Sequence, residues 1–253
     1  MAEIITLITQ ARTGSTRLPQ KVLLTINKKE LLKIHLDRLA NSKLVSHIVV
    51  ATTDHINDDV IFDKCNEWGY HVVRGSENDV LDRYHKASLE YPSDYIVRVT
   101  SDCPLIDPKL VDQVIQFTID NKLDYCSNTL IEHYPDGQDI EVFTSDALQK
   151  AWENAKLASE REHVTPYIKL NSTFYDKYEF VSANYNSPAD YNSIRMTVDE
   201  KLDFDLIQTV IENLGITSSW QEYTDYIITN NLQKINNNII RNEGYLKSVA
   251  KDE

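Results

Sequence analysis

Short apolar runs alternate with longer amphipathic segments through the first hundred residues, and this alternation constrains the fold more than any other feature. Strands are predicted at residues 4–9, 48–51, 70–73 and 95–99. Helices are predicted between them, around Leu32, Leu36 and Leu39 and at residues 58–68 and 80–90. Uninterrupted apolar strands are typical of a parallel sheet that is buried on both faces. We therefore predict an α/β fold, with a mostly parallel sheet and helices on both faces.

The second half of the chain is less regular. Strands are predicted at residues 139–143 and 194–198, and helices at residues 145–156, 160–169 and 201–213. Residues 230–253 are rich in Asn, Lys and Glu, which favours a C-terminal surface helix with a frayed tail. No Pro/Gly/Ser-rich linker interrupts the sequence, so residues 1–253 are predicted to form a single domain.

Composition excludes several classes of partner. The 253 residues carry a formal net charge of −13, whereas nucleic-acid binding depends on clustered Lys and Arg. The three cysteines form no zinc pattern and no disulfide framework, which favours a reducing compartment. The apolar run at the N-terminus is too short for a membrane helix and lacks the features of a signal peptide. We expect a cytoplasmic protein that binds neither nucleic acid nor membrane.

The loop at residues 10–21 directly follows the first predicted strand. It combines Arg12, Arg17 and Lys21 with Gly14 and Ser15. A triphosphate requires cations together with exposed backbone N–H groups, and this loop supplies both. The spacing matches neither a Walker loop nor a GxGxxG fingerprint. A solvated basic loop is the alternative interpretation.

Two carboxylates are candidate metal ligands. Asp102 follows the strand predicted at residues 95–99, and Asp199 follows the one at residues 194–198. Mg²⁺ commonly takes one or two protein carboxylates together with substrate phosphates, so both could meet on one cation. Helix capping is the competing role for Asp199. We assign capping to Asp107, because Pro108 follows it.

Weaker candidates lie elsewhere in the sequence. Asp139 and Glu141 would share one face of a strand and could bind a polyol. Glu162 and His163 could take part in acid–base or metal chemistry, although their spacing matches no zinc motif and a lone helical histidine is more often structural. Asp79 lies in a Gly-Ser turn, where helix capping is an alternative role.

Four separated motifs together resemble a known family. In order, they are ARxGSxRLPxK at residues 11–21, GSxxDVLDRY at residues 75–84, RVTxDCPLIDP at residues 98–108 and MTVDExLD at residues 196–203. They are similar to the spore coat polysaccharide biosynthesis protein F-like cytidylyltransferases, which are relatives of the CMP-sialate and CMP-3-deoxy-manno-octulosonate synthetases. The resemblance covers about residues 3–210.

The resemblance implies a Rossmann-like nucleotidyltransferase A fold and a role for each matching residue. Arg12, Lys21 and Asp102 would be catalytic, and Asp102 and Asp199 would hold Mg²⁺, which Mn²⁺ could replace. CTP would contact Ala11, Arg12, Gly14, Ser15, Arg17, Lys21, Thr53, Asp79, Thr100 and Asp102. The acceptor would contact Asp139, Glu141, Glu162, His163 and Arg195.

The implied reaction transfers CMP from CTP to a small sugar-acid or phosphorylated acceptor and releases pyrophosphate, in surface polysaccharide biosynthesis. The resemblance also implies a homodimer. The sequence departs from the family pattern where Gln20 and Ser101 replace glycines. Two other functions stay open: a nucleotide-sugar-dependent glycosyltransferase, whose DxD pattern would be residues 203–205, and a non-catalytic nucleotide-binding protein.

Overall fold

A single seven-stranded sheet runs through the computed structural model, which describes residues 3–252. The strand order is β5-β4-β1-β6-β8-β7-β9, and β1, β4, β5 and β6 are mutually parallel. β8 is antiparallel to both of its neighbours. The strands are β1 Ile5–Gln10, β4 His47–Thr53, β5 His71–Gly75, β6 Tyr95–Thr100, β7 Tyr125–Ser127, β8 Glu141–Thr144 and β9 Ser182–Asn184. A short hairpin is formed by β2 Thr25–Ile26 and β3 Lys29–Glu30.

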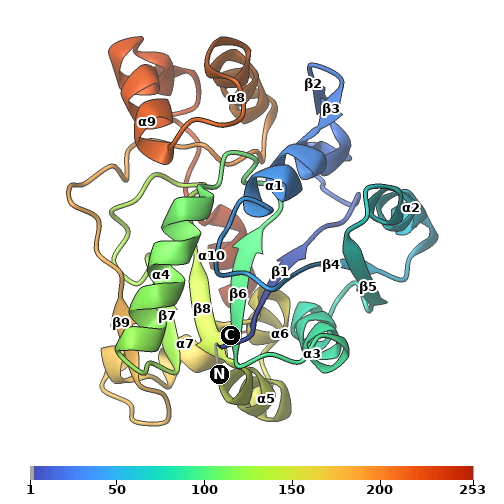
Figure 1. Cartoon of the computed structure of the whole chain (residues 1–253), viewed down its shortest axis with the longest axis vertical. Helices are drawn as coiled ribbons and strands as arrows, with labels where there is room; N and C mark the ends of the chain where they lie inside the picture. The colour runs from blue at the N-terminus through green and yellow to red at the C-terminus, as the bar shows by residue number, and fades with distance from the viewer. Residues whose placement is uncertain (1–2, 253) are drawn as a thin grey trace.

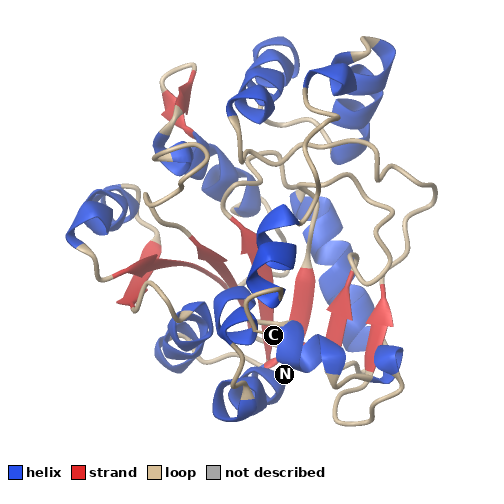
Figure 2. Cartoon of the chain, turned by 180° about the vertical axis from the view of Figure 1, so that it is seen from behind, coloured by secondary structure: helices blue, strands red, loops and turns tan. Residues whose placement is uncertain are grey.

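Helices cover both faces of this sheet (Figures 1 and 2). The α-helices are α1 Leu31–Leu39, α2 Asp59–Glu67, α3 Val80–Glu90, α4 Pro108–Asp120, α5 Ser145–Asn154, α6 Ala158–His163, α7 Pro166–Leu170, α8 Lys201–Leu214, α9 Trp220–Thr229 and α10 Glu243–Val249. Four 3-10 turns complete the structure: η1 Lys21–Leu23, η2 Ile56–Asp58, η3 Thr173–Tyr175 and η4 Leu232–Ile235. The predicted α/β architecture is confirmed.

Strand β1 shows why the fold has two cores. Leu7 and Ile8 are both fully buried, but they point to opposite faces of the sheet. Ile8 packs with residues of α3 and α5, and Leu7 packs with residues of α4. In the register of β1 and β4, Thr9 pairs with Val50. Val50 packs against α1 and α2, on the same face of the sheet as Leu7. Burial on both faces explains the uninterrupted apolar strands.

Two predicted elements of the second half are wrong. Residues 194–198 form no strand, only an isolated bridge between Asp136 and Arg195, because this segment crosses the end of the sheet instead of joining it. The helix predicted at residues 160–169 is broken into α6 and α7 at Val164, where φ is 72°. Pro166 has no N–H to donate to the carbonyl of Glu162, so α6 cannot continue through it, and α7 begins at this proline instead.

Residues 230–252 are folded onto the rest of the protein. They contain η4 and α10, and α10 packs against α6. Within the part of the chain that the structure describes, no helix combines the length and apolar character needed to cross a membrane.

Replacing Gly137 by alanine should destabilise the protein strongly. Its φ of 102° is strained for other residues, and an added Cβ would lie 2.7 Å from the carbonyl carbon of Met196. Gly69 has a similar φ of 79°, but an added Cβ there meets nothing within 4 Å. We expect urea unfolding to show a loss of about 1 kcal/mol for Gly69→Ala and at least ~2 kcal/mol more for Gly137→Ala. Equal losses would contradict the close packing of Gly137 against residues 196–197.

Candidate active site

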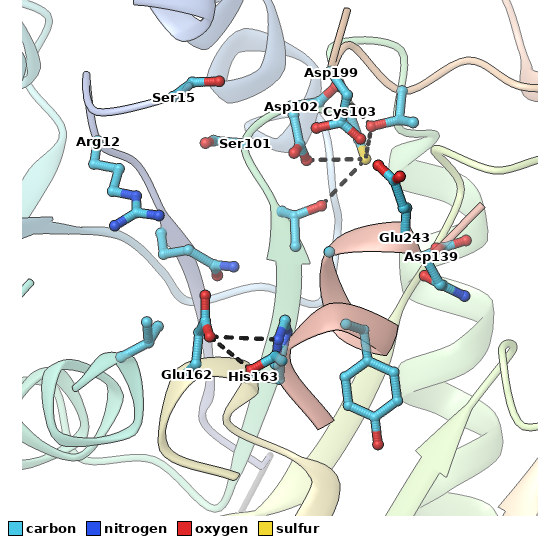
Figure 3. Close-up of a pocket in the computed structure, with 18 of the residues that line it drawn as sticks. Arg12, Ser15, Ser101, Asp102, Cys103, Asp139, Glu162, His163, Asp199 and Glu243 are labelled. Carbon is cyan, nitrogen blue, oxygen red and sulfur yellow. Dashed lines mark hydrogen bonds and ion pairs between the residues drawn. The ribbon is translucent and has the colours of Figure 1, made fainter. Parts of the chain in front are cut away.

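A cavity of about 920 Å³ opens beyond the carboxyl ends of β1 and β6, the expected ligand site of an open parallel sheet. Its lining comes from the loops after β1, β5 and β6, the first turn of α3, residues 129–141, α6, α7, residues 195–199 and the C-terminal residues 242–251. In Figure 3, Asp102, Cys103 and Asp199 lie at one end, and Glu162 and His163 lie at the other. All predicted site residues line this cavity except Thr53 and Asp79.

Lys21 joins the two predicted metal ligands. Its Nζ lies 2.7 Å from a carboxylate oxygen of Asp102 and 2.7 Å from one of Asp199, although these residues are far apart in the sequence. Burial works against the charge of Lys21, but the two carboxylates outweigh it and raise the pKa of its ammonium. Burial likewise opposes ionisation of Asp102, yet Lys21 holds the pKa of this carboxyl well below its usual range. Lys21 and Asp102 are therefore both charged at neutral pH.

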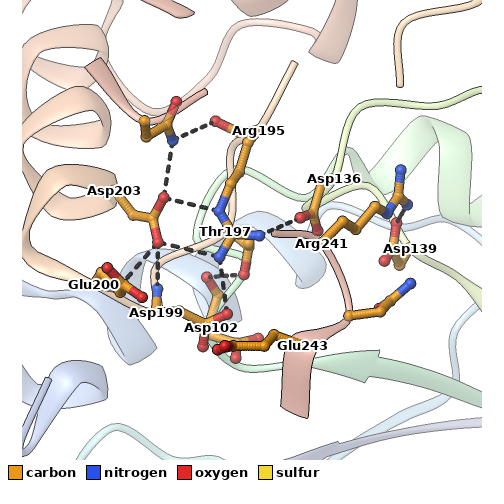
Figure 4. Close-up of polar contacts among 12 residues, drawn as sticks. Asp102, Asp136, Asp139, Arg195, Thr197, Asp199, Glu200, Asp203, Arg241 and Glu243 are labelled. Carbon is orange, nitrogen blue, oxygen red and sulfur yellow. Dashed lines mark hydrogen bonds and ion pairs between the residues drawn. The ribbon is translucent and has the colours of Figure 1, made fainter. Parts of the chain in front are cut away.

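Asp199 is held in place by the guanidinium of Arg195 (Figure 4). Arg195 is only 7% exposed at its side chain and donates to Asp136 at 2.5 Å, to Asp199 at 2.9 Å and to Asp203 at 2.9 Å. Asp203 is completely buried and also accepts from the backbone N–H groups of Asp199 and Glu200. Arg195, predicted to bind the acceptor, lines the cavity and donates from each of its three nitrogen atoms to a carboxylate.

The loop that carries Asp102 is held by a buried histidine. His35 on α1 donates from Nδ1 to the carbonyl of Cys103 at 2.9 Å, and its Nε2 accepts from the hydroxyl of Thr9 at 3.1 Å. The carbonyl can only accept, so the proton lies on Nδ1. Burial lowers the pKa of His35 to about 4, which keeps the ring neutral.

The loop at residues 10–21 presents both kinds of phosphate-binding group. Arg12 pairs with Glu77 at 3.0 Å, and Arg17 pairs with Asp199 at 3.0 Å. Backbone N–H groups of Gly14, Thr16 and Arg17 have no acceptor within residues 3–252. The loop can therefore offer N–H donors and two partly exposed guanidinium groups to an anion.

Gln20 takes the conformation that a glycine would take at its position. Its φ is 54°, in the left-handed region, and its backbone N–H donates to the carbonyl of Thr13 at 3.1 Å. The loop therefore keeps a tight turn before Lys21 although no glycine is present. Ser101, the other departure from the family pattern, is buried at the wall of the cavity.

Most of the predicted acceptor residues are already bonded within the protein. Glu141 accepts from Arg98 at 2.5 Å, from Tyr125 at 2.7 Å and from Thr165 at 2.6 Å. Burial opposes its ionisation, but Arg98 and these hydrogen bonds hold the pKa of Glu141 below its usual range. Asp139 pairs with Arg241 at 2.7 Å. These carboxylates shape the part of the cavity that was predicted to bind the acceptor.

Thr53 and Asp79, both predicted to bind nucleotide, do not line the cavity and make their contacts within the protein. Thr53 is fully buried and donates to Asp58, which also accepts from the N–H and hydroxyl of Thr13 at 2.7 Å each. Through Asp58, Thr53 thus helps to hold Thr13 and the loop at residues 10–21 in place. Asp79 caps α3 and binds Arg161, with a shortest distance of 2.6 Å.

Several lining residues were missed from the sequence. Asp136 is buried and Arg98 is partly buried, and their charged partners lie 59 and 43 residues away. His35 could have been noticed as a polar residue on the otherwise apolar face of Leu32, Leu36 and Leu39. Nothing in the polar C-terminal sequence indicated that α10 would reach the cavity.

The carboxylates of Asp102 and Asp199 fit a hard divalent cation. Each carboxylate directs an oxygen toward the same point, which the Nζ atom of Lys21 occupies. Within residues 3–252 there is no group of three or more His, Cys, Asp or Glu side chains placed to hold a metal ion. Mg²⁺ needs only one or two protein carboxylates when substrate phosphates and water complete its shell.

The fold and the cavity define a nucleotidyltransferase, and comparison with known proteins identifies the family. The model of the cytidylyltransferase family matches residues 6–231, and the chain belongs to this family. A cytidylyltransferase structure from Leptospira borgpetersenii serovar Hardjo-bovis superimposes with a TM-score of 0.86 at 32% identity, covering 94% of this chain and 98% of that chain. The predicted fold and family are confirmed.

Two curated relatives extend over most of the chain. An uncharacterized protein of Methanocaldococcus jannaschii is 40% identical over 237 residues, covering 92% of this chain and 94% of that protein. The spore coat polysaccharide biosynthesis protein SpsF of Bacillus subtilis is 35% identical over 218 residues, covering 83% of this chain and 88% of that protein. The class of reaction is therefore nucleotidyl transfer.

Asp203→Ala should unfold the site, because it leaves the buried Arg195 without its deepest partner. Removing one member of a buried ion pair costs about 3–5 kcal/mol. Asp205→Ala is the matched control, since within residues 3–252 the only ion-pair partner of Asp205 is the exposed Lys201 on the same helix. We expect it to cost at most ~0.5 kcal/mol. The test is urea unfolding of both variants, and similar midpoints for the two would contradict the assigned role of Asp203.

Proposed function

We propose that this chain transfers CMP from CTP to a small sugar-acid or phosphorylated acceptor and releases pyrophosphate, in the synthesis of a surface polysaccharide. Membership of the cytidylyltransferase family supports the nucleotide donor. The name of the B. subtilis relative, a spore coat polysaccharide biosynthesis protein, supports the pathway.

One observation carries the proposal: the ammonium of Lys21 bridges Asp102 and Asp199 in a cavity that Arg12 and Arg17 also line. The chain as a whole carries a charge of −13, yet this cavity is lined by equal numbers of basic and acidic side chains. The charge balance of the cavity is thus less negative than that of the chain as a whole, which favours the binding of an anion such as a triphosphate.

In the proposed reaction, an acceptor oxygen attacks the α-phosphorus of CTP in line with the bond to the bridging oxygen. That bond breaks, and pyrophosphate leaves with its electron pair. Lys21, Arg12 and Arg17 bind the phosphates and offset the charge that develops on the leaving group. Asp102 and Asp199 would hold Mg²⁺ or Mn²⁺, which when bound supplies Lewis-acid stabilisation of phosphate charge.

The glycosyltransferase alternative is less well supported. Its DxD pattern would consist of Asp203 and Asp205, but both lie on α8. Asp203 is completely buried against Arg195, and Asp205 points to solvent beside Lys201. These two side chains could not jointly hold a metal and a nucleotide sugar.

The proposal includes a cytoplasmic location and a homodimer. The free thiols of Cys65, Cys103 and Cys126, all buried, support a reducing compartment. The homodimer rests on the family resemblance, and light scattering of the purified protein would test it.

The direct test is pyrophosphate release with each of the four NTPs and Mg²⁺, against a panel of sugar acids and phosphorylated polyols. We expect release with CTP and one class of acceptor, and none after EDTA treatment, because the phosphate charge then lacks its counter-ion. Mg²⁺-dependent CTP binding without release on any acceptor would favour a non-catalytic nucleotide-binding protein.

Lys21→Ala and Asp102→Asn should each lower kcat by at least ~100-fold, the scale of losing one preorganised charge contact. Lys177→Ala and Asp225→Asn make the same chemical changes at exposed positions outside the cavity and should keep wild-type turnover. Circular dichroism would check folding. Near wild-type turnover in folded Asp102→Asn would remove Asp102 from the mechanism.

A further inference from the structure

The C-terminal segment, residues 241–252, lies outside the part of the chain that matches the family, which ends at residue 231. It nevertheless supplies a substantial part of the cavity wall. Seven of its residues line the cavity: Asn242, Glu243, Gly244, Tyr245, Lys247, Ser248 and Lys251. These residues therefore form a wall of the cavity that lies outside the region matched to the family.

This segment is fixed to the acceptor end of the cavity. Arg241 pairs with Asp139 at 2.7 Å, at the start of the segment. Ser248 donates to Glu162 on α6 at 2.7 Å, and Asp252 accepts from the backbone N–H of Ser159 at 3.3 Å. Polar contacts along its length therefore hold the C-terminal segment against α6 and the residues before β8.

Two ammonium groups at this end lack a counter-charge. Lys169 on α7 and Lys251 after α10 both line the cavity, and neither has an ion-pair partner within residues 3–252. Lys21 and Arg195, by contrast, each pair with at least two carboxylates. In a chain of net charge −13, two unpaired lysines at one cavity favour an anionic ligand.

Two aromatic rings line the same cavity as these lysines. The ring of His163 meets the ring of Tyr245 edge to face, with centroids 5.0 Å apart. The Nε2 atom of His163 is buried, lies 3.9 Å from a carboxylate oxygen of Glu162, and has no hydrogen-bond partner among the described residues. Burial, with Arg98 nearby, lowers the pKa of His163 to about 4, so the ring is uncharged at neutral pH. A hydroxyl group of a bound polyol would satisfy this atom.

We propose that the C-terminal segment is the acceptor-selecting wall of the active site, where Lys251 and Lys169 bind an anionic group of the acceptor and Tyr245 and His163 contact its polyol chain. The anionic group is a carboxylate or a phosphate. This inference rests on the proposed function, because it takes the other end of the cavity as the nucleotide site.

The position of Glu243 separates the two anionic ligands. Its carboxylate lies 3.9 Å from Arg17 of the phosphate-binding loop, between that loop and the rest of α10. A triphosphate that extended past Arg17 would meet this negative charge. The nucleotide phosphates thus bind Arg12, Arg17 and Lys21. Lys169 and Lys251 stay free to bind the acceptor.

Equilibrium binding tests the proposal without requiring turnover. The probes are 3-deoxy-manno-octulosonate for the carboxylate, glycerol 3-phosphate for the phosphate, and glycerol as the neutral counterpart. Calorimetric titrations use the full-length protein with Mg²⁺ and CDP, which fills the nucleotide end but cannot release pyrophosphate. The variants are Lys251→Glu and Lys169→Glu, with Lys234→Glu as a matched charge reversal on the exposed turn η4 outside the cavity.

We expect wild-type protein to bind at least one anionic probe more tightly than glycerol, and each cavity variant to weaken that binding by about tenfold or more. Lys234→Glu should bind as wild type, and the Kd for CTP should be unchanged in all three. The probe that binds shows whether the group is a carboxylate or a phosphate. If a reversal variant also loses CTP binding, Lys251→Met and Lys169→Met, which remove the charge only, decide the result.

Two results would overturn the proposal: neither anionic probe binds wild-type protein more tightly than glycerol, or the cavity variants bind the probes as wild type does. Failure of the proposed function is a different result. It would appear as absence of pyrophosphate release from CTP, while the effect of the lysines on anion binding persisted.

Discussion

The buried guanidinium of Arg195 is the interaction on which the active site depends. It gathers Asp136, Asp199 and Asp203, which come from a loop before β8, from the segment after residue 194 and from α8. A buried charge without partners is very costly, so the three carboxylates and the cation must assemble together or not at all. Once assembled, Asp199 faces Lys21, and residues 194–198 are tied across the end of the sheet.

The sheet supplies the other half of this arrangement. Because β1 and β6 are parallel neighbours, the loops that follow them emerge side by side and bring Lys21 next to Asp102. His35 then links the two loops from beneath, since it bonds both Thr9 at the end of β1 and the carbonyl of Cys103. The geometry of the site thus follows from strand order and from two buried polar residues, Arg195 and His35, which hold Asp199 and the loop of Asp102 in place.

Sequence reasoning succeeded where the signal was local. Helix α3 begins and ends where its periodicity predicted, at Val80–Glu90, and the parallel strands follow from uninterrupted apolar runs. It failed where long-range contacts decide the outcome. Apolar and polar residues alternate at positions 194–198 as they do in a strand. Arg195, however, forms ion pairs with Asp136 and Asp203, and the segment does not join the sheet. The contact between α10 and the cavity depends on pairs such as Ser248 with Glu162, separated by 86 residues, which no local pattern reveals.

Gln20 shows how the site makes use of backbone strain. A non-glycine residue in the left-handed region costs about 1–2 kcal/mol and persists only where its surroundings fix it. Here the backbone N–H of Gln20 donates to Thr13, and Thr13 is itself held by Asp58. The turn therefore places Lys21 at the start of η1, with its ammonium group directed at Asp102 and Asp199. The strain is located one residue before the central cation of the site, where an altered backbone would move that charge away from both carboxylates.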